Sequence, residues 1–503
     1  PVTVIRVVEE GKLSLDSEAL QSVLLQKDVQ NLPVVVLSVA GDFRTGKSSI
    51  LNVLLRFPYL QFEDWLGEPD KPLEGFPWTS GSDPHTEGIV FWSHLIKATT
   101  ADGKQVAVLL ADTQGSFGTS SSTAESVNIC ALSVLISSIQ VFNVMRNLQL
   151  DHLQHLQTYY EYAKQVQGLV GGASSFQLCV FLVRDWPWPT EYEFGWEGGE
   201  RLLEKILGAQ KKNKPTDELC DLRTYFKSCL SSRKCFLMHP PGQTDDGFSI
   251  NGAVNGITPS FNKNLRDFVW GVLSPSELVV KTVAGVPVTA SELCRFVEKM
   301  TPMFSSEKLP VPGVMVGKTA EFFSELAREK ALVEYCSSLG QVLLSNGVSL
   351  SLEELTQKEE NTRQEVLDSF DSAPGLKLYE YNKKKRESFI QELDMIFSEV
   401  WKKYQDLRKE YEESEELEKG LTRKAKWLKF ASEVTAFCAN LAVASTKRKL
   451  ALGITFGCGC AKIMATNTSE AAANIKQKKE LTSANAAREL AADLEKKKLF
   501  LAG

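Results

Sequence analysis

An apolar run that leads straight into a glycine-bounded loop constrains the fold of this chain more than any other feature. Residues 33–40 (PVVVLSVA) are rich in β-branched side chains, which is typical of a strand buried on both faces. The loop GDFRTGKS follows at 41–48, and residues 49–56 (SILNVLLR) have a helical pattern. A strand, a glycine loop and a helix in this order predict a phosphate-binding loop, or P-loop, and make a fortuitous glycine turn a weak alternative.

The loop residues carry the predicted phosphate chemistry. Successive backbone amides of such a loop wrap a phosphate, and the following helix adds the positive end of its dipole. Lys47 is expected to reach the β- and γ-phosphates as a catalytic group, and the Ser48 hydroxyl to ligate Mg²⁺. The predicted nucleotide-binding residues of the loop are Gly41, Asp42, Phe43, Arg44, Thr45, Gly46, Lys47, Ser48 and Ser49.

A second apolar run, at 105–111 (QVAVLLA), ends in the motif Asp112-Thr-Gln-Gly115. A carboxylate at a strand end is expected to hold Mg²⁺ through water, and the Gly115 amide to meet the γ-phosphate beside Gln114. An Asp-x-x-Gly motif alone is a weak signal because many copies are ordinary turns. Its position after a buried strand favours the metal-binding interpretation.

Two further apolar runs end in candidate nucleotide-binding residues. Residues 176–183 (FQLCVFLV) precede Arg184 and Asp185, and residues 234–238 precede His239. The Asp185 carboxylate can accept two hydrogen bonds from guanine N1–H and the exocyclic amine, which adenine does not offer. The alternative is an Asp that caps a helix beside a Trp-Pro-Trp-Pro turn. Because ligands bind beyond the carboxyl ends of parallel strands, we expect all four loops to share one edge of a sheet.

Composition and charge limit the class of protein. The 503 residues are 43% hydrophobic and 24% charged, which is ordinary globular composition and suggests about three folding units at ~150 residues each. The ten cysteines form no zinc-binding spacing and fit a reducing compartment. Residues 423–503 hold 15 basic and 6 acidic residues, whereas the rest of the chain is acidic, so no nucleic-acid partner is expected. The basic end predicts either a tail near an anionic membrane or a solvated basic helix.

The C-terminal half reads as helical. Residues 307–313 (EKLPVPG) predict a hinge, and an apolar stripe from Phe389 to Leu407 predicts a helical bundle. Two apolar pieces, 430–446 and 450–466, flank the basic break Lys-Arg-Lys and predict an intramembrane hairpin. The first piece is only weakly hydrophobic, so a small-residue helix packed on protein is the alternative.

Taken together, these residues resemble the atlastin and guanylate-binding branch of the dynamin superfamily. The resemblance covers most of residues 30–340, and the Arg-Asp motif is specific to this branch. It implies an α/β P-loop GTPase domain with a mostly parallel sheet and helices on both faces, followed by an all-α bundle and a membrane-associated helical tail. The implied limits are 1–308 for the GTPase domain, 309–314 for the hinge, 315–425 for the bundle, 426–466 for the membrane hairpin and 467–503 for a basic amphipathic tail.

The resemblance also implies a function. Such a chain binds and hydrolyses GTP with Mg²⁺, forms a homodimer through the GTPase domain in a nucleotide-dependent way, and remodels, tethers or fuses membranes. Arg44 is implied to act as an arginine finger in cis. Thr86 is implied to close over the nucleotide as a metal ligand and catalytic residue. Two departures from the family pattern are Ser116 after Gly115, where small GTPases place a glutamine, and Pro84 before His-Thr.

Location and partners follow from the same resemblance. It places the chain on the cytoplasmic face of the endoplasmic reticulum or an endosome, anchored by its C-terminal segment to membrane lipids. Within the branch the chain is most similar to atlastin relatives that carry an N-terminal RING finger. The chain has no RING zinc pattern, so we expect that module upstream of Pro1. One alternative function is therefore a GTP-controlled switch or scaffold with ubiquitin-pathway partners, and another is an ATP-dependent P-loop enzyme.

Overall fold

The computed structural model describes two compact units, Pro1–Phe322 and Phe323–Gly503. The boundary between them falls inside a helix, whereas the sequence predicted a hinge at 309–314; the predicted domain limits stay predictions. The residues described are 1–8, 12–41, 45–68, 71, 73–77, 88–114, 123–149, 152–153, 156, 177–208, 232–241, 257–304, 309–346, 350–373, 379–413, 426–427, 429–431 and 433–434.

The first unit is built on a mixed sheet, which has nine strands within the described residues. The strands are β1 (Val2–Val7), β2 (Leu13–Leu15), β3 (Val34–Gly41), β4 (Ile89–Phe91), β5 (Ile96–Thr99), β6 (Gln105–Thr113), β7 (Ile139–Met145), β8 (Leu178–Arg184) and β9 (Arg233–Leu237). Their order is β2-β1-β4-β6-β3-β7-β8-β9, with β5 also paired to β6. The run from β6 to β9 is parallel, and β1, β2, β4 and β5 pair antiparallel. The prediction of a mostly parallel sheet therefore holds for β6, β3, β7, β8 and β9, and the sheet as a whole is mixed.

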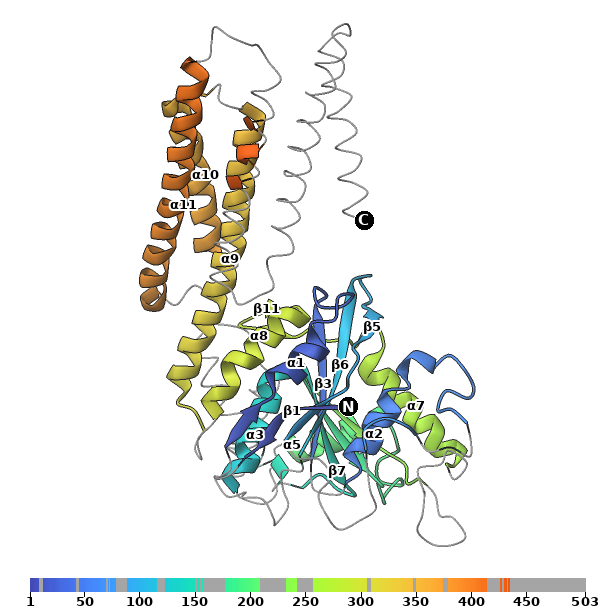
Figure 1. The fold of residues 1–503 in the computed structure, drawn as a ribbon. Helices are drawn as coiled ribbons and strands as arrows, with labels where there is room; N and C mark the ends of the chain where they lie inside the picture. The colour runs from blue at the N-terminus through green and yellow to red at the C-terminus, as the bar shows by residue number, and fades with distance from the viewer. Residues whose placement is uncertain are drawn as a thin grey trace, which may run out of the picture. The chain divides into compact units, whose positions relative to one another are not determined.

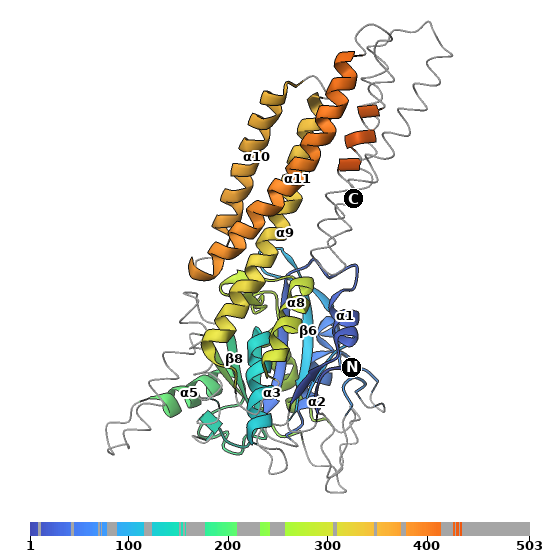
Figure 2. The same cartoon turned by 60° about the vertical axis from the view of Figure 1, so that its left-hand side comes forward.

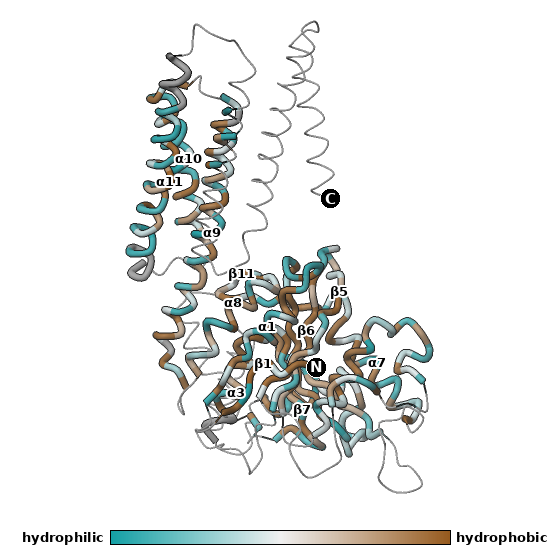
Figure 3. The backbone as a smooth tube through the Cα atoms, in the orientation of Figure 1, coloured by the Kyte–Doolittle hydropathy of each residue, from teal (hydrophilic) through white to brown (hydrophobic). Residues whose placement is uncertain are grey.

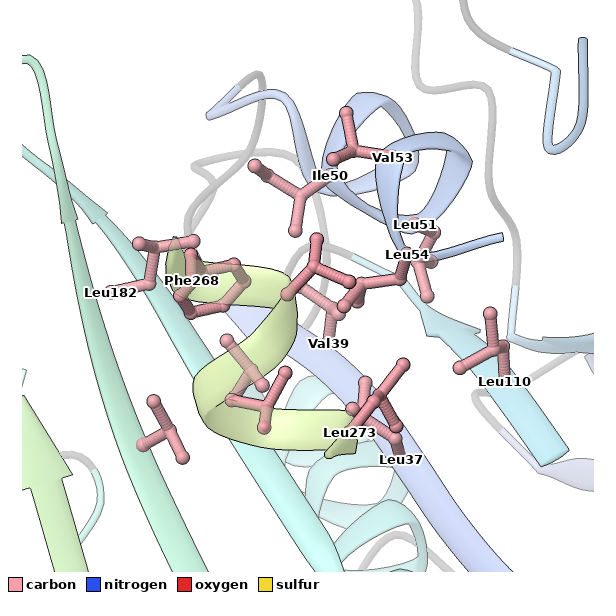
Figure 4. Close-up of a cluster of buried hydrophobic side chains, with 14 of the residues drawn as sticks. Leu37, Val39, Ile50, Leu51, Val53, Leu54, Leu110, Leu182, Phe268 and Leu273 are labelled. Carbon is pink, nitrogen blue, oxygen red and sulfur yellow. The ribbon is translucent and has the colours of Figure 1, made fainter. Parts of the chain in front are cut away.

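Helices cover both faces of this sheet, as predicted (Figures 1 and 2). They include α1 (Ser17–Leu24), α2 (Lys47–Leu54), α3 (Thr123–Ile136), α5 (Trp196–Leu207), α7 (Pro259–Leu273) and α8 (Ala290–Met300). Successive strand residues point to opposite faces, so Leu37 and Val39 pack with α2 and α7. Figure 4 shows this cluster, with Phe268 and Leu273 of α7 beside the α2 leucines. Phe142 and Phe181 belong to a second cluster with α3 and α5.

Hydroxyl side chains also form hydrogen-bond contacts between the sheet and the region of α3. Ser38 of β3 lies 2.6 Å from the Ser137 hydroxyl and donates to Gln140 Oε1 at 2.7 Å. Thr113 of β6 lies 3.0 Å from the Ser133 hydroxyl of α3. All five side chains are buried, and a buried hydroxyl is costly unless it is hydrogen-bonded. The paired hydroxyls therefore specify how α3 sits on the sheet.

The first unit also contains shorter elements. They are the 3-10 helices η2 (Phe57–Tyr59) and η4 (Thr301–Phe304), and the two-stranded pair β10 (Thr282–Val283) and β11 (Val286–Pro287). Helix α8 begins with a capping box, in which the Thr289 hydroxyl accepts from the Glu292 amide and the Glu292 carboxylate accepts from the Thr289 amide. This reciprocal pair satisfies two amides that the first helical turn leaves unbonded.

The second unit is helical, as the sequence predicted. Helix α9 (Pro312–Asn346) enters it from the first unit, and α10 (Leu352–Ser372) and α11 (Tyr379–Glu413) follow. Figure 3 shows hydrophobic and hydrophilic residues alternating along these helices, as expected for amphipathic helices. The predicted stripe on α11 supplies core residues, namely Phe389, Leu393, Ile396, Val400 and Tyr404.

Ionic contacts, most of them partly buried, join the three helices. Arg328 of α9 donates two hydrogen bonds, at 2.7 and 2.8 Å, to the Glu392 carboxylate of α11. Tyr335 of α9 and Arg363 of α10 both donate to Glu359, and Arg363 also contacts Asp394 of α11. Bidentate and charge-assisted hydrogen bonds have strict geometry, so these contacts fix the helix register as well as adding stability.

The start of the predicted membrane hairpin is helical and packs on this bundle. Trp427, Phe430 and Val434 are buried in the bundle core, and the Trp427 ring lies 5.8 Å from the Tyr404 ring. These contacts support the protein-packed alternative for residues 427–434. The rest of the hairpin segment and the basic tail, 435–503, lie outside the described residues. Among the helices that the structure describes, none combines the length and the apolar character needed to cross a bilayer.

Lys281 gives a testable consequence of burial. Its side chain is 2% exposed, and its ammonium donates to the Ser137 carbonyl at 2.9 Å. Burial lowers the pKa of Lys281 from 10.5 to about 7, so between these values the unfolded chain binds more protons than the folded one. The free energy of unfolding should therefore rise with pH, by up to about 1.4 kcal/mol per pH unit from this group.

Replacing Lys281 by methionine should remove that contribution. We expect chemical denaturation of Lys281→Met to show a smaller increase in stability from neutral to alkaline pH than the wild type shows. Lys97→Met is the control, because Lys97 is an exposed lysine paired with Asp28. Equal pH slopes in wild type and Lys281→Met would contradict a lowered pKa at Lys281.

Candidate nucleotide site

The carboxyl ends of the parallel strands meet at one edge of the sheet, as predicted. Val39 of β3 pairs with Asp112 of β6, and Gly41 of β3 pairs with Asn143 of β7. The end of β8, at Arg184, is paired in turn with β7. This register brings together residues that are up to about 140 positions apart in the sequence.

The described part of the P-loop needs its glycines. Gly41 has a φ of 148°, and a Cβ there would lie 2.1 Å from the backbone oxygen of Asn143. Gly46 has a φ of 76° and forms the N-cap of α2 without a side-chain cap. The first amides of an uncapped helix are available to an anion, and the helix dipole favours negative charge there. The geometry suits a phosphate at the start of α2.

Lys47, Ser48 and Asp112 lie beside this helix start. Lys47 is 8% exposed, and its ammonium donates to the Gly41 carbonyl at 3.4 Å. Its positive charge therefore lies beside the first residue of the loop. The Ser48 hydroxyl donates to Asp112 Oδ2 at 2.7 Å. Hydroxyl and carboxylate oxygens are ligands that Mg²⁺ prefers, so this partly buried pair fits the metal predicted from the sequence. Among the described residues there is no group of three or more His, Cys, Asp or Glu side chains that could hold a metal ion.

Gln114 joins two segments that the sequence assigned to the site. Its side-chain Oε1 accepts from the Gly88 backbone amide at 2.8 Å, and its backbone amide donates to the Gly88 carbonyl at 2.9 Å. Gly88 has a φ of 76°, and a Cβ there would lie 1.9 Å from the Ile5 backbone oxygen. The Gln114 side chain therefore anchors the end of the segment that contains Thr86.

Arg184 ends β8 and Asp185 follows it, and the two side chains face different groups. Arg184 Nη1 lies 3.4 Å from the carbonyls of both Thr45 and Gly46, so the guanidinium braces the P-loop backbone. Burial lowers the pKa of Arg184, and the neighbouring Asp185 carboxylate opposes that shift. Asp185 has a left-handed φ of 52°, and its buried Oδ1 has no hydrogen-bond partner among the described residues. A buried carboxylate oxygen of this kind can accept a hydrogen bond from a ligand.

His239 lies after β9 in a tightly bonded loop. Its amide donates to Asn264 Oδ1 at 2.8 Å, and its ring Nδ1 lies 2.6 Å from the Pro240 carbonyl. A carbonyl only accepts, so Nδ1 carries the hydrogen. The imidazole also packs against the Phe194 ring, with centroids 4.5 Å apart. These contacts give His239 a structural role at the sheet edge, and its predicted role with the nucleotide stays a prediction.

Several predicted site residues lie outside the described residues: Asp42, Phe43, Arg44, Thr86 and Gly115. Ser49 is described and lies in the first turn of α2. The sequence reasoning missed Asn143 as a site residue. The signal was present in residues 139–145 (IQVFNVM), an apolar run that forms β7 and ends beside the P-loop.

Comparisons with known proteins agree with this geometry. The family model "Guanylate-binding protein, N-terminal domain" matches residues 10–282. Human atlastin-3 is 38% identical over 376 residues, covering 74% of this chain and 69% of the relative. Atlastin-2 of Xenopus laevis is 35% identical over 80% of this chain and 70% of the relative. Atlastin-1 of Bos taurus is 34% identical over 80% of this chain and 72% of the relative.

The chain belongs to the atlastin and guanylate-binding branch of the dynamin-superfamily GTPases. The family match covers β3, β6, β7, β8 and β9, which carry the candidate site. The resemblance inferred from the sequence motifs is therefore confirmed, and the family supplies GTP hydrolysis as its chemistry. The particular roles of Arg44, Thr86 and Asp185 are not tested by the comparisons.

The Gly41 geometry predicts a severe effect of a single methyl group in this GTPase. In Gly41→Ala the Cβ would meet a backbone oxygen that cannot move without breaking the β3–β7 pairing. We expect a loss of at least about 2 kcal/mol of stability and at least about 100-fold weaker nucleotide binding. Denaturation and a fluorescent-nucleotide titration measure both quantities.

Gly103→Ala is the matched control for this substitution. Gly103 also has a positive φ, of 81°, but a Cβ there would meet nothing within 4 Å. It should cost about 1 kcal/mol of backbone strain and leave nucleotide affinity unchanged. Similar effects of the two substitutions would mean that the losses in Gly41→Ala come from backbone strain and not from the contact with Asn143.

Proposed function

We propose that this chain binds GTP together with Mg²⁺ and hydrolyses it, dimerises in a nucleotide-dependent way and acts on membranes. The observation that carries the proposal is the Ser48–Asp112 pair beside the uncapped start of α2. Membership in the branch supports GTP as the substrate. The proposal therefore combines a loop and helix start that suit a phosphate with a family whose members hydrolyse GTP.

Base selection is assigned to Asp185. Its buried Oδ1 lacks a partner among the described residues, and its left-handed backbone holds it at the end of β8. Guanine offers two adjacent N–H donors on one edge, whereas adenine offers an acceptor there. A carboxylate at this position would favour guanine and disfavour adenine.

The mechanism assigns each charged group to a part of the triphosphate. Lys47 would bind the β- and γ-phosphates, and the amides at the start of α2 would hold the phosphate oxygens. Mg²⁺, held by Ser48 and by Asp112 through water, would neutralise charge that develops on the phosphates. Arg44 would act in cis on the same charge, and Thr86 would orient the attacking water. Gln114, which is bonded to Gly88, would hold the Thr86 segment against the end of β6.

Dimer formation and membrane action are the further parts of the proposal. The atlastin relatives support both, and the basic character of residues 423–503 supports attraction to an anionic membrane. The proposed location is the cytoplasmic face of the endoplasmic reticulum or an endosome. The relatives lend no support to ubiquitin-pathway partners, which stay a prediction from the sequence alone.

Asp185→Asn tests the base assignment. Replacing the carboxylate by an amide removes one acceptor and introduces a donor, so GTP should bind about 100-fold more weakly. Xanthosine triphosphate carries a carbonyl where guanine has its amine. It should bind to Asp185→Asn more tightly than it binds to the wild type. Competition titrations with GTP, ATP and xanthosine triphosphate measure the selectivity. An unchanged order of the three affinities would contradict the role of Asp185.

Arg44→Ala tests the proposed arginine finger. Loss of a group that acts mainly in the transition state should lower kcat by about 10³-fold, while GTP affinity changes little. Hydrolysis and dimerisation would be followed together in wild type and variant. Turnover that survives in Arg44→Ala would exclude this role, and a wild type that binds GTP without turnover would favour the switch or scaffold function.

A further inference from the structure

The side chain of Asn143 reaches from β7 to the P-loop. It is fully buried, and its Nδ2 donates to the Thr45 carbonyl at 2.7 Å across a separation of 98 residues. The opposite orientation of the amide would place Oδ1 against the Thr45 carbonyl oxygen, and two acceptors at 2.7 Å repel each other. The hydrogen bond therefore fixes which way this amide faces.

Asn143 also contacts the other end of the loop. Its backbone is paired with Gly41, and its carbonyl oxygen lies where a Gly41 side chain would begin. One residue of β7 thus touches Gly41, where β3 ends, and Thr45, just before α2 begins. The loop between these points is held to the sheet at both ends by the same neighbour.

The bond to Thr45 determines the direction of an amide. A trans peptide is planar, and its C=O and N–H point in opposite directions. Because the Thr45 carbonyl points to Asn143, the Gly46 N–H in the same peptide plane points away from Asn143. The next carbonyl, of Gly46, lies near Arg184 Nη1 and accepts from the Ile50 amide at 3.1 Å, so the Lys47 amide is fixed as well.

We propose that Asn143 is a positioning residue for nucleotide hydrolysis, which holds the Thr45–Gly46 peptide so that the Gly46 and Lys47 amides are set for the phosphates before the nucleotide binds. This inference rests on the proposed GTP hydrolysis. Preorganised amides need no reorientation when charge develops on the phosphates. Asn143 acts through the backbone that it holds and does not itself contact the nucleotide.

The isosteric substitution Asn143→Asp separates positioning from packing. It keeps the size of the side chain and places a carboxylate oxygen against the Thr45 carbonyl. Burial raises the pKa of a carboxyl group, whereas the Arg184 guanidinium, which lies 3.4 Å from the same Thr45 carbonyl, opposes that rise. Once protonated, the carboxyl would donate to Thr45 as the amide does. We expect kcat/KM for GTP to fall at least about tenfold at alkaline pH. Relative to wild type, it should recover about fivefold or more as the pH is lowered through the pKa of the new carboxyl.

Gln140→Glu is the matched control. Gln140 lies on the same strand, is 3% exposed and accepts from Ser38, so its substitution also buries an acid in β7. It is not in contact with the P-loop among the described residues, so its kcat/KM should show no pH-dependent recovery. A recovery of equal size in Gln140→Glu and Asn143→Asp would overturn the inference, because it would follow from stability alone.

A second pair of variants covers the case in which Asn143→Asp does not fold. Asn143→Ala should lower kcat/KM about tenfold, whereas Gln140→Ala should leave it within about twofold of the wild type. Equal kcat/KM in these two variants would overturn the inference. Absence of nucleotide binding and hydrolysis in the wild type would instead overturn the proposed function, so the two failures are distinguishable.

Discussion

The parallel pairing of β3 with β6 on one side and β7 on the other decides where Asp112 and Asn143 lie relative to the P-loop. It places Asp112 beside the Ser48 hydroxyl and Asn143 beside Gly41. Because side chains alternate along a strand, a slip of one residue in either pairing would turn these groups to the other face of the sheet. The register of the buried strands thus determines the position of the P-loop.

Buried polar groups protect that register at a cost in stability. Ser38 and Ser137 link β3 to α3 within hydrogen-bond distance, and Lys281 adds an ammonium that bonds the Ser137 carbonyl. Apolar packing alone is tolerant of small shifts, whereas a hydrogen bond that breaks in the interior leaves a costly unpaired group. Lys281 shows this cost in stability most clearly, since burial lowers its pKa to about 7. The polar contacts therefore favour one arrangement of α3 on the sheet over its neighbours.

The sequence predicted the features that depend on local pattern. The P-loop, the Asp112 strand and the helical stripe from Phe389 to Tyr404 are each written within a short segment. The role of Asn143 was not predictable in this way, because it depends on a pairing between residues 98 positions apart. Strand β7 was also missed, although its sequence is an apolar run. The strands β1, β2, β4 and β5 were missed for a related reason. They are three to six residues long, too short for a strong periodic signal, and they are defined by antiparallel partners.

The packing of residues 427–434 changes how the apolar segment after them can be interpreted. Trp427 contacts both Tyr404 and Phe430, and large aromatic side chains lose much of their stabilisation when they leave a core. While these residues stay on the bundle, the first apolar piece that remains is 435–446, about 12 residues long. A helix needs about 20 residues to cross a bilayer. A piece of this length is therefore too short to cross a bilayer as a single helix.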